Sequence, residues 1–164
     1  MTRPTPRVRL LVCGSADRGD DGAALLAAAH VLPALSPEIR DRLEVRRCSQ
    51  LDPSDLIAVR EGESCLVVDT VFGVEPGAVV VIPLAELMTA GGVNPRSSHA
   101  LPIDQVVGIA EAIRGGLPPG MFVGIGGKWF GFGEMQSRAV RSGMLAFERA
   151  ILDGLRELVA LAPA

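Results

Sequence analysis

Apolar and polar positions along the chain fall into two alternating patterns, short apolar runs and longer stretches with a helical period. The runs typical of strands are residues 7–13, 42–47, 64–69, 78–82 and 121–125. The stretches with helical character are residues 20–33, 52–59, 102–114 and 136–161. Strands that alternate with helices in this way predict an α/β fold built on a parallel sheet.

We therefore expect one α/β domain over residues 1–164, since this length suits a single core. The expected architecture is a three-layer α/β/α domain with a five-stranded, mostly parallel twisted sheet of the phosphorylase/hydrolase-like type. The run at 78–82 is expected at an edge, paired antiparallel. Residues 1–6 are predicted to form a flexible tail.

The net charge, the cysteine spacing and the length of the apolar runs argue against several classes of protein. The chain has 16 basic and 19 acidic residues, a net charge of −3, which does not suit a nucleic-acid surface. Its three cysteines have no paired spacing, which argues against a disulfide framework, and Cys13 and Cys65 are predicted to be buried in strands. No apolar run approaches about 20 residues, so we expect no membrane span and a cytoplasmic location.

Three residues stand where a parallel sheet places its ligands. Asp21 lies in a Gly-rich turn after the first strand, Asp69 ends the third strand, and His99 precedes a helix. The carboxyl ends of parallel strands share one edge, so these side chains are expected to face each other. Two carboxylates and an imidazole suit a borderline metal ion and leave coordination positions open. A position near a helix amino end favours the neutral imidazole that a metal requires.

Simpler roles stay open on pattern alone. Asp20 or Asp21 would serve as the N-cap of the first helix. Asp69 would serve as a structural residue, and His99 as a solvated loop residue. His30, on an Ala-rich helix, is interpreted as a helix-edge residue without a function.

Several segments, in this order, resemble the hydrogenase maturation endopeptidases. They are Leu11-Val12-Cys13-Gly14 with Asp20-Asp21-Gly22, then Leu66-Val67-Val68-Asp69, then Ser97-Ser98-His99, and later Phe122-Val123-Gly124-Ile125-Gly126 before a long terminal helix. The resemblance covers nearly the whole chain. It implies that Asp21, Asp69 and His99 are both the metal site and the catalytic residues.

The resemblance also implies the reaction and the partner. Such an enzyme removes the C-terminal peptide of a nickel-iron hydrogenase large-subunit precursor after nickel insertion, and it recognises the inserted nickel. It would be a nickel-dependent, aspartic-type endopeptidase with no permanently bound cofactor, because it engages the nickel of its substrate transiently. The expected partner is that precursor protein, with no nucleic acid, and a monomer is favoured.

Two segments depart from the family pattern. The turn after Gly14 lacks the family's Asn, and Cys48-Ser49-Gln50-Leu51 stands where the family carries Gly-Gly-Thr. We predict that the second segment sets which precursor is accepted rather than whether the chemistry occurs.

Other classes of function share some of these residues. A non-cleaving, precursor-binding chaperone of the same family would keep the fold. A phospho-accepting receiver domain would use Asp20, Asp21, Asp69 and Lys128, although six residues separate Cys13 from Asp20 here. A dinucleotide site is disfavoured, because the turn lacks G-x-G-x-x-G and its aspartates would repel a pyrophosphate.

Residues 126–133 form a Gly-rich segment that contains Trp129, Phe130 and Phe132. We predict a mobile, substrate-facing loop, because exposed aromatic side chains often mark binding surfaces. The alternative interpretation is that Trp129 folds back onto the core.

Overall fold

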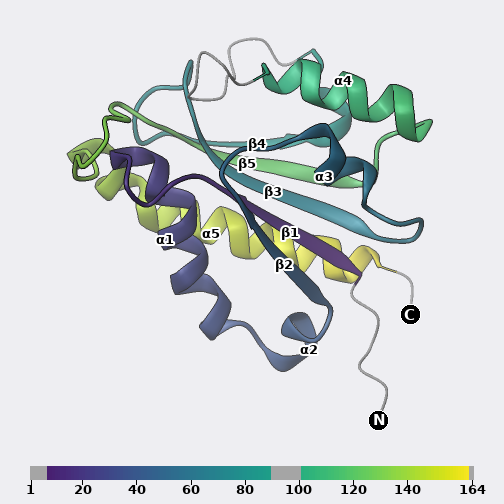
Figure 1. The fold of residues 1–164 in the computed structure, drawn as a ribbon. Coiled ribbons are helices and arrows are strands. Elements are labelled where there is room, and N and C mark those ends of the chain that lie inside the picture. Colours follow the sequence, from purple (N-terminus) through teal and green to yellow (C-terminus); the bar gives the residue numbers. More distant parts are fainter. Residues whose placement is uncertain (1–6, 90–100, 163–164) are drawn as a thin grey trace.

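The computed structural model describes residues 7–89 and 101–162, in which helices cover both faces of a five-stranded sheet (Figure 1). The strands are β1 (Val8–Cys13), β2 (Leu43–Cys48), β3 (Ser64–Val71), β4 (Val79–Pro83) and β5 (Gly120–Gly126). The α-helices are α1 (Ala23–Val31), α2 (Pro37–Arg40), α3 (Pro53–Ile57), α4 (Ile103–Arg114) and α5 (Arg138–Leu161). The 3-10 turns are η1 (Gly19–Gly22), η2 (Leu32–Ala34) and η3 (Leu84–Glu86).

The sheet confirms the predicted fold class. Its strand order is β2-β1-β3-β5-β4. β1 pairs in parallel with β2 and β3, and β3 pairs in parallel with β5. β4 is antiparallel to β5 at the edge, as the sequence predicted.

Two separate cores lie on the two faces of the sheet. Figure 1 shows α1 and α5 below the sheet and α3 and α4 above it. Because side chains alternate along a strand, Leu10 and Val12 of β1 enter the lower core, while Leu11 and Cys13 enter the upper one. The central strand β3 is buried along its whole length, which explains its unbroken apolar run.

Local side-chain and backbone chemistry defines three helix ends, of which the sequence predicted the first two. Asp52 caps α3 in a capping box with Asp55. Gly115 ends α4 with φ +82, a conformation that favours glycine. Ser137 caps α5, where its side chain accepts a hydrogen bond from the backbone N–H of Val140.

The predicted cap of the first helix is wrong. Arg18 precedes η1 and Gly22 precedes α1, and neither position has a side-chain cap hydrogen bond. Asp20 and Asp21 lie inside η1 instead, and both are buried. The carboxylate of Asp20 accepts backbone N–H groups from the connection between β5 and α5, and that of Asp21 accepts the N–H of Ser15. Neither aspartate is therefore used as a cap.

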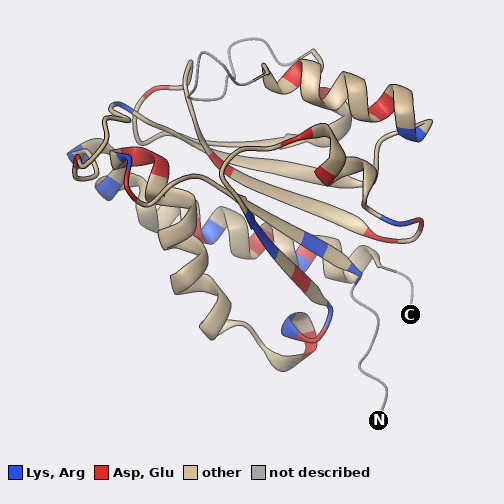
Figure 2. Cartoon of the chain, viewed as in Figure 1, with Lys and Arg blue, Asp and Glu red and all other residues tan. Residues whose placement is uncertain are grey.

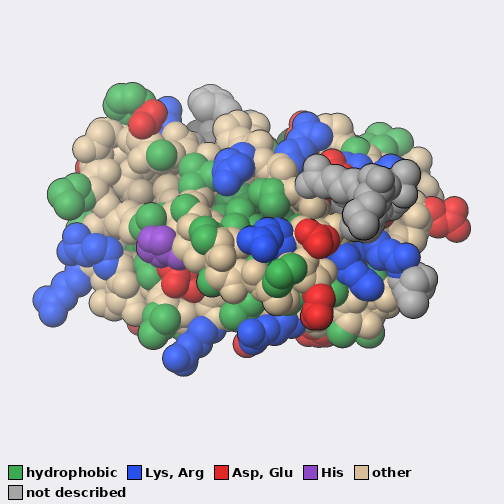
Figure 3. Space-filling model, turned by 90° about the horizontal axis from the view of Figure 1, so that it is seen from below, with side chains coloured by type: hydrophobic (Ala, Val, Ile, Leu, Met, Phe, Trp, Pro, Cys, Tyr) green, Lys and Arg blue, Asp and Glu red, His purple; other side chains and the backbone are tan. Residues whose placement is uncertain are grey.

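The charged side chains are spread over the described surface. Figure 2 shows acidic residues in the turn after β1, where η1 lies. Figure 3 shows the molecule from below, with basic side chains scattered among hydrophobic and acidic ones rather than joined in one basic patch. None of the helices in the two described ranges has the length and apolar character that crossing a membrane requires. The predicted tail and His99 lie outside the described residues.

Candidate functional site

The first and third strands end where the sheet changes its winding direction. From β1 the chain adds β2 on one side, and it then crosses over to place β3 on the other side of β1. In open α/β sheets this change leaves a crevice at the carboxyl ends of the central strands, where ligands bind. Asp21 in η1, after β1, and Asp69 in β3 both belong to this edge.

The turn after β1 holds Asp21 close to the end of that strand. The backbone N–H of Ser15 donates to Oδ2 of Asp21 at 2.8 Å. Gly14 has φ +141, and a Cβ atom there would lie 2.1 Å from the backbone oxygen of Asp21. Glycine is therefore required at this position. The absence of a side chain at Gly14 makes room for the backbone of Asp21, not for a dinucleotide phosphate. This argues further against a dinucleotide site.

Asp69 lies on the upper face of the sheet, on the side of α3 and α4. Its carboxylate Oδ1 accepts the backbone N–H of Thr70 at 2.8 Å, and the residue is 8% exposed. It lines a cavity of about 10 Å³ together with Gln50 and Leu51, which follow β2, and with side chains of α4. That volume holds no more than about one water molecule.

A direct contact joins the segments that carry the two carboxylates. The hydroxyl of Thr70 donates to the backbone oxygen of Asp20 at 2.9 Å. Residue 70 follows Asp69 and residue 20 precedes Asp21, so the two aspartates share one edge of the sheet. Whether the two side chains act together as a site stays a prediction.

The third predicted residue, His99, lies outside the described residues. Within residues 7–89 and 101–162, no group of three His, Cys, Asp or Glu side chains could hold a metal ion. The predicted site of Asp21, Asp69 and His99 therefore stays a prediction.

Asp20 has a role that the sequence did not reveal. This fully buried carboxylate accepts three backbone N–H groups, from Lys128 at 2.7 Å, Trp129 at 3.1 Å and Ser137 at 2.6 Å. The N–H of Ser137 lies at the amino end of α5, where the helix dipole favours negative charge. The backbone N–H of Asp20 also donates to the backbone oxygen of Trp129 at 2.9 Å. A single carboxylate thus fixes the β5–α5 connection to the turn that carries Asp21.

That connection presents Trp129 and Phe132 to solvent, while Phe130 is half-buried. Trp129 is 44% exposed and Phe132 77% exposed, so Trp129 does not fold back onto the core. The ammonium of Lys128 lies 4.6 Å from the centre of the Trp129 ring, and the ring of Phe130 lies 4.4 Å from that of Phe72. The predicted exposure is confirmed. The predicted mobility stays a prediction.

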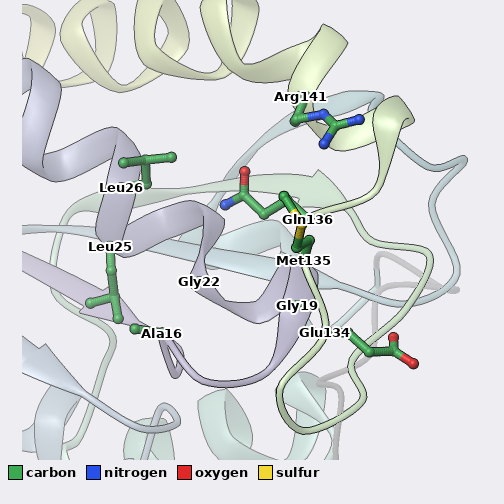
Figure 4. Close-up of a pocket in the computed structure, with 9 residues that line it drawn as sticks. All are labelled: Ala16, Gly19, Gly22, Leu25, Leu26, Glu134, Met135, Gln136 and Arg141. Carbon is green, nitrogen blue, oxygen red and sulfur yellow. The ribbon is translucent and has the colours of Figure 1, made fainter.

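A groove of about 530 Å³ lies beside the same connection. Figure 4 shows Leu25 and Leu26 on α1 at one side of it and Arg141 on α5 at the other, with Met135 and Gln136 between them. Because Gly19 and Gly22 of η1 also line it, the groove borders the turn that carries both aspartates.

Two cysteines meet on the upper face of the sheet, near the Asp69 carboxylate. Cys13 ends β1 and Cys48 ends β2, the two residues are direct register partners, and their sulfur atoms are 2.9 Å apart. The hydrogen bond with Cys48, burial and the nearby Asp69 carboxylate raise the pKa of Cys13. Burial raises the pKa of Cys65, elsewhere on β3, to about 12. Cys13 and Cys48 are 35 residues apart in the sequence, so a search for paired cysteine spacing could not predict their contact.

Comparisons with known proteins identify this architecture. No family model and no curated protein matches the chain. Solved structures do match: the E. coli hydrogenase maturating endopeptidase HybD, at 18% identity and a TM-score of 0.70, covers 92% of this chain and 93% of its own. The NiFe hydrogenase maturation protease HybD of Thermococcus kodakarensis has 21% identity and a TM-score of 0.59, and covers 90% and 97%. The endopeptidase HycI of Escherichia coli has 22% identity and a TM-score of 0.58, and covers 87% and 86%.

This chain has the fold of the hydrogenase maturation proteases. The likeness extends over nearly the full length of both chains. It establishes the arrangement of strands and helices around the crevice at the ends of β1 and β3.

The receiver interpretation fits this structure poorly. A receiver requires its lysine at the phospho-accepting aspartate, but here the ammonium of Lys128 lies over the Trp129 ring. Asp20, which a receiver would use for a metal ion, is instead occupied by three backbone N–H groups.

The contact made by Asp20 generates a testable prediction. Asp20→Asn replaces one acceptor oxygen by an NH₂ group that cannot accept from a backbone N–H, so buried donors lose their partner. We expect it to lower the free energy of unfolding by about 2–4 kcal/mol. Trp129 is the only tryptophan, so its fluorescence reports on the loop directly, and a red shift in native buffer is expected.

The control is Asp17→Asn, an exposed aspartate of the same turn. It should change neither the urea midpoint nor the emission maximum. An Asp20→Asn variant with wild-type stability and emission would show that the carboxylate does not hold the loop.

Proposed function

We propose that the chain is a hydrogenase maturation endopeptidase, which removes the C-terminal peptide of a nickel-iron hydrogenase large-subunit precursor after nickel insertion. The observation that supports this proposal is the Thr70–Asp20 hydrogen bond, which joins the segments that carry Asp69 and Asp21. The shared fold supports it, because the solved structures with this architecture are named as maturation proteases and endopeptidases. A cytoplasmic enzyme with no resident cofactor is part of the proposal.

The proposed mechanism uses the metal ion of the substrate. Asp21, Asp69 and His99 would contact the nickel of the precursor, and few protein ligands leave positions open for the precursor's own ligands and for water. A divalent metal ion polarises the scissile carbonyl and acidifies a bound water. Hydrolysis would then require no Ser or Cys nucleophile, and a precursor without nickel would remain uncut.

The buried setting of the aspartates suits this role. Both carboxylates accept a backbone N–H, from Ser15 and from Thr70, and such hydrogen bonds fix the orientation of each carboxylate group. Low exposure to water strengthens the attraction between a carboxylate and a cation. The electrostatic attraction would thus favour a metal-loaded substrate over a metal-free one.

The test is cleavage of nickel-loaded and nickel-free precursor by Asp21→Asn, Asp69→Asn and His99→Ala. Each variant should lose at least about 100-fold in cleavage rate, because the positioned contacts supply charge stabilisation. The wild-type chain should leave nickel-free precursor intact. Shortening of the precursor is followed by mass spectrometry.

Matched controls are Asp17→Asn, in the same turn as Asp21, and His30→Ala, outside the site. Both should cleave like wild type, and thermal melts should show that every variant folds. Equal cleavage of nickel-free precursor, or wild-type rates in Asp69→Asn, would contradict the mechanism. Binding of the precursor without any cleavage by the wild-type chain would identify the non-cleaving chaperone instead.

The segment after β2 generates a second prediction. Gln50 and Leu51 line the cavity next to Asp69, so they are placed to contact the part of a precursor that reaches this carboxylate. The combined change Ser49→Gly, Gln50→Gly and Leu51→Thr should alter the choice among precursors by about tenfold, since lost apolar contacts are worth about 1–3 kcal/mol. Cleavage of an accepted precursor should change less than threefold. Equal loss on every precursor would show that the segment supports the chemistry itself.

The exposed aromatic loop generates a third prediction. We propose that Trp129 and Phe132 contact the precursor, because they are exposed and Asp20 holds their loop beside the turn with Asp21. Trp129→Ala and Phe132→Ala should each weaken precursor binding by about tenfold, measured by titration calorimetry. Leu145→Ala, which removes an exposed apolar side chain of α5, is the control and should bind like wild type. Wild-type affinity in both loop variants would remove this surface from the interface.

A further inference from the structure

The two thiols at the ends of β1 and β2 are in a geometry that permits a disulfide. Cys13 and Cys48 are direct partners in the parallel register, and adjacent strands lie about 4.8 Å apart, within the Cα separation that a disulfide spans. Their sulfur atoms are already in contact at 2.9 Å. The backbone N–H of Gly14 donates to the backbone oxygen of Cys48 at 2.9 Å, which fixes the two strand ends relative to each other.

The two cysteine residues differ in their access to solvent. Cys13 is fully buried, whereas Cys48 is half-buried at the outer strand of the sheet. Cys48 is therefore the residue that a small oxidant would reach first, and the Cys13 sulfur lies in contact with it as a resolving thiol. Cys65 is fully buried in the central strand.

We propose that Cys13 and Cys48 form a reversible intramolecular disulfide with peroxide as the oxidant. Peroxide transfers one oxygen to the Cys48 sulfur, which yields a sulfenic acid and water. The Cys13 sulfur then attacks the Cys48 sulfur, the S–O bond breaks, and the hydroxyl leaves as a second water with the Cys13 proton. The thiol pair loses two electrons and the peroxide gains them. A dithiol reductant returns both thiols by exchange.

The disulfide would act on the candidate site, and this part rests on the proposed function. Cys48 begins the segment whose Gln50 and Leu51 close the cavity at Asp69. That cavity, about 10 Å³, is too small for a peptide, so a precursor that reaches Asp69 has to displace one of its walls. A covalent bond from Cys48 to β1 restrains that wall. Oxidation is thus expected to slow precursor cleavage.

Disulfide formation is tested on the wild-type chain, so this test does not depend on whether a variant folds. The reduced protein is treated with hydrogen peroxide, unfolded, and labelled with a maleimide. One of the three cysteines should take the label, and trypsin should release a cross-link between residues 10–18 and 48–60 that dithiothreitol separates. Three labelled thiols, over-oxidised Cys48 without a cross-link, or a bond that joins two chains would overturn the proposal.

The effect on the site is tested by comparing each protein with itself before and after peroxide. Wild type should lose at least fivefold in cleavage rate and regain it with dithiothreitol, and Cys65→Ala should behave like wild type. In Cys13→Ala and in Cys48→Ser the ratio of the two rates should stay near one. Cross-linked wild type that cleaves at an unchanged rate would overturn the regulatory effect. If the chain cleaves no precursor at all, the proposed function fails, while the cross-linked peptide still decides the modification.

Discussion

The buried carboxylate of Asp20 is the contact on which the arrangement of this site depends. It joins the turn after β1, the connection after β5 and the first residue of α5 through three backbone N–H groups. A charge that is fully removed from water requires such partners, because an unpaired buried carboxylate is strongly destabilising. Backbone donors and a helix amino end provide them without a basic side chain. The negative charge therefore becomes a structural element that holds two distant segments together.

This contact explains how one short turn serves two purposes. Asp20 points into the protein and fixes the aromatic loop, while the next residue, Asp21, is held by Ser15 at the crevice. The backbone oxygen of Asp20 accepts the hydroxyl of Thr70, which links the same turn to the strand that carries Asp69. The proposed site for a metal-loaded protein substrate would use both features, the aspartates at the crevice and the exposed loop beside them.

The two faces of the sheet contribute different chemistry to that crevice. The lower face, with α1 and α5, supplies the groove and the exposed loop. The upper face, with α3 and α4, supplies the small cavity at Asp69 and the Cys13–Cys48 pair. Successive side chains along β1 and β3 point to opposite faces of the sheet, so sequence position decides the face on which each residue lies. The exposed aromatic loop and the Cys13–Cys48 pair therefore lie on opposite sides of one sheet.

The sequence by itself determined the elements and the sheet. Apolar runs and helical periods depend on neighbouring residues, so they predicted all five strands, the antiparallel edge strand β4, the capped helix α3 and the end of α4 at Gly115. The parallel topology then predicted a shared edge for Asp21 and Asp69, because the carboxyl ends of parallel strands share an edge. Only the tertiary structure decided which of the two adjacent aspartates is structural. The partners of Asp20 lie 108 to 117 residues away, and Cys48 is 35 residues from Cys13. Local patterns carry no information about such contacts, since the folded sheet alone brings the partners within hydrogen-bond distance.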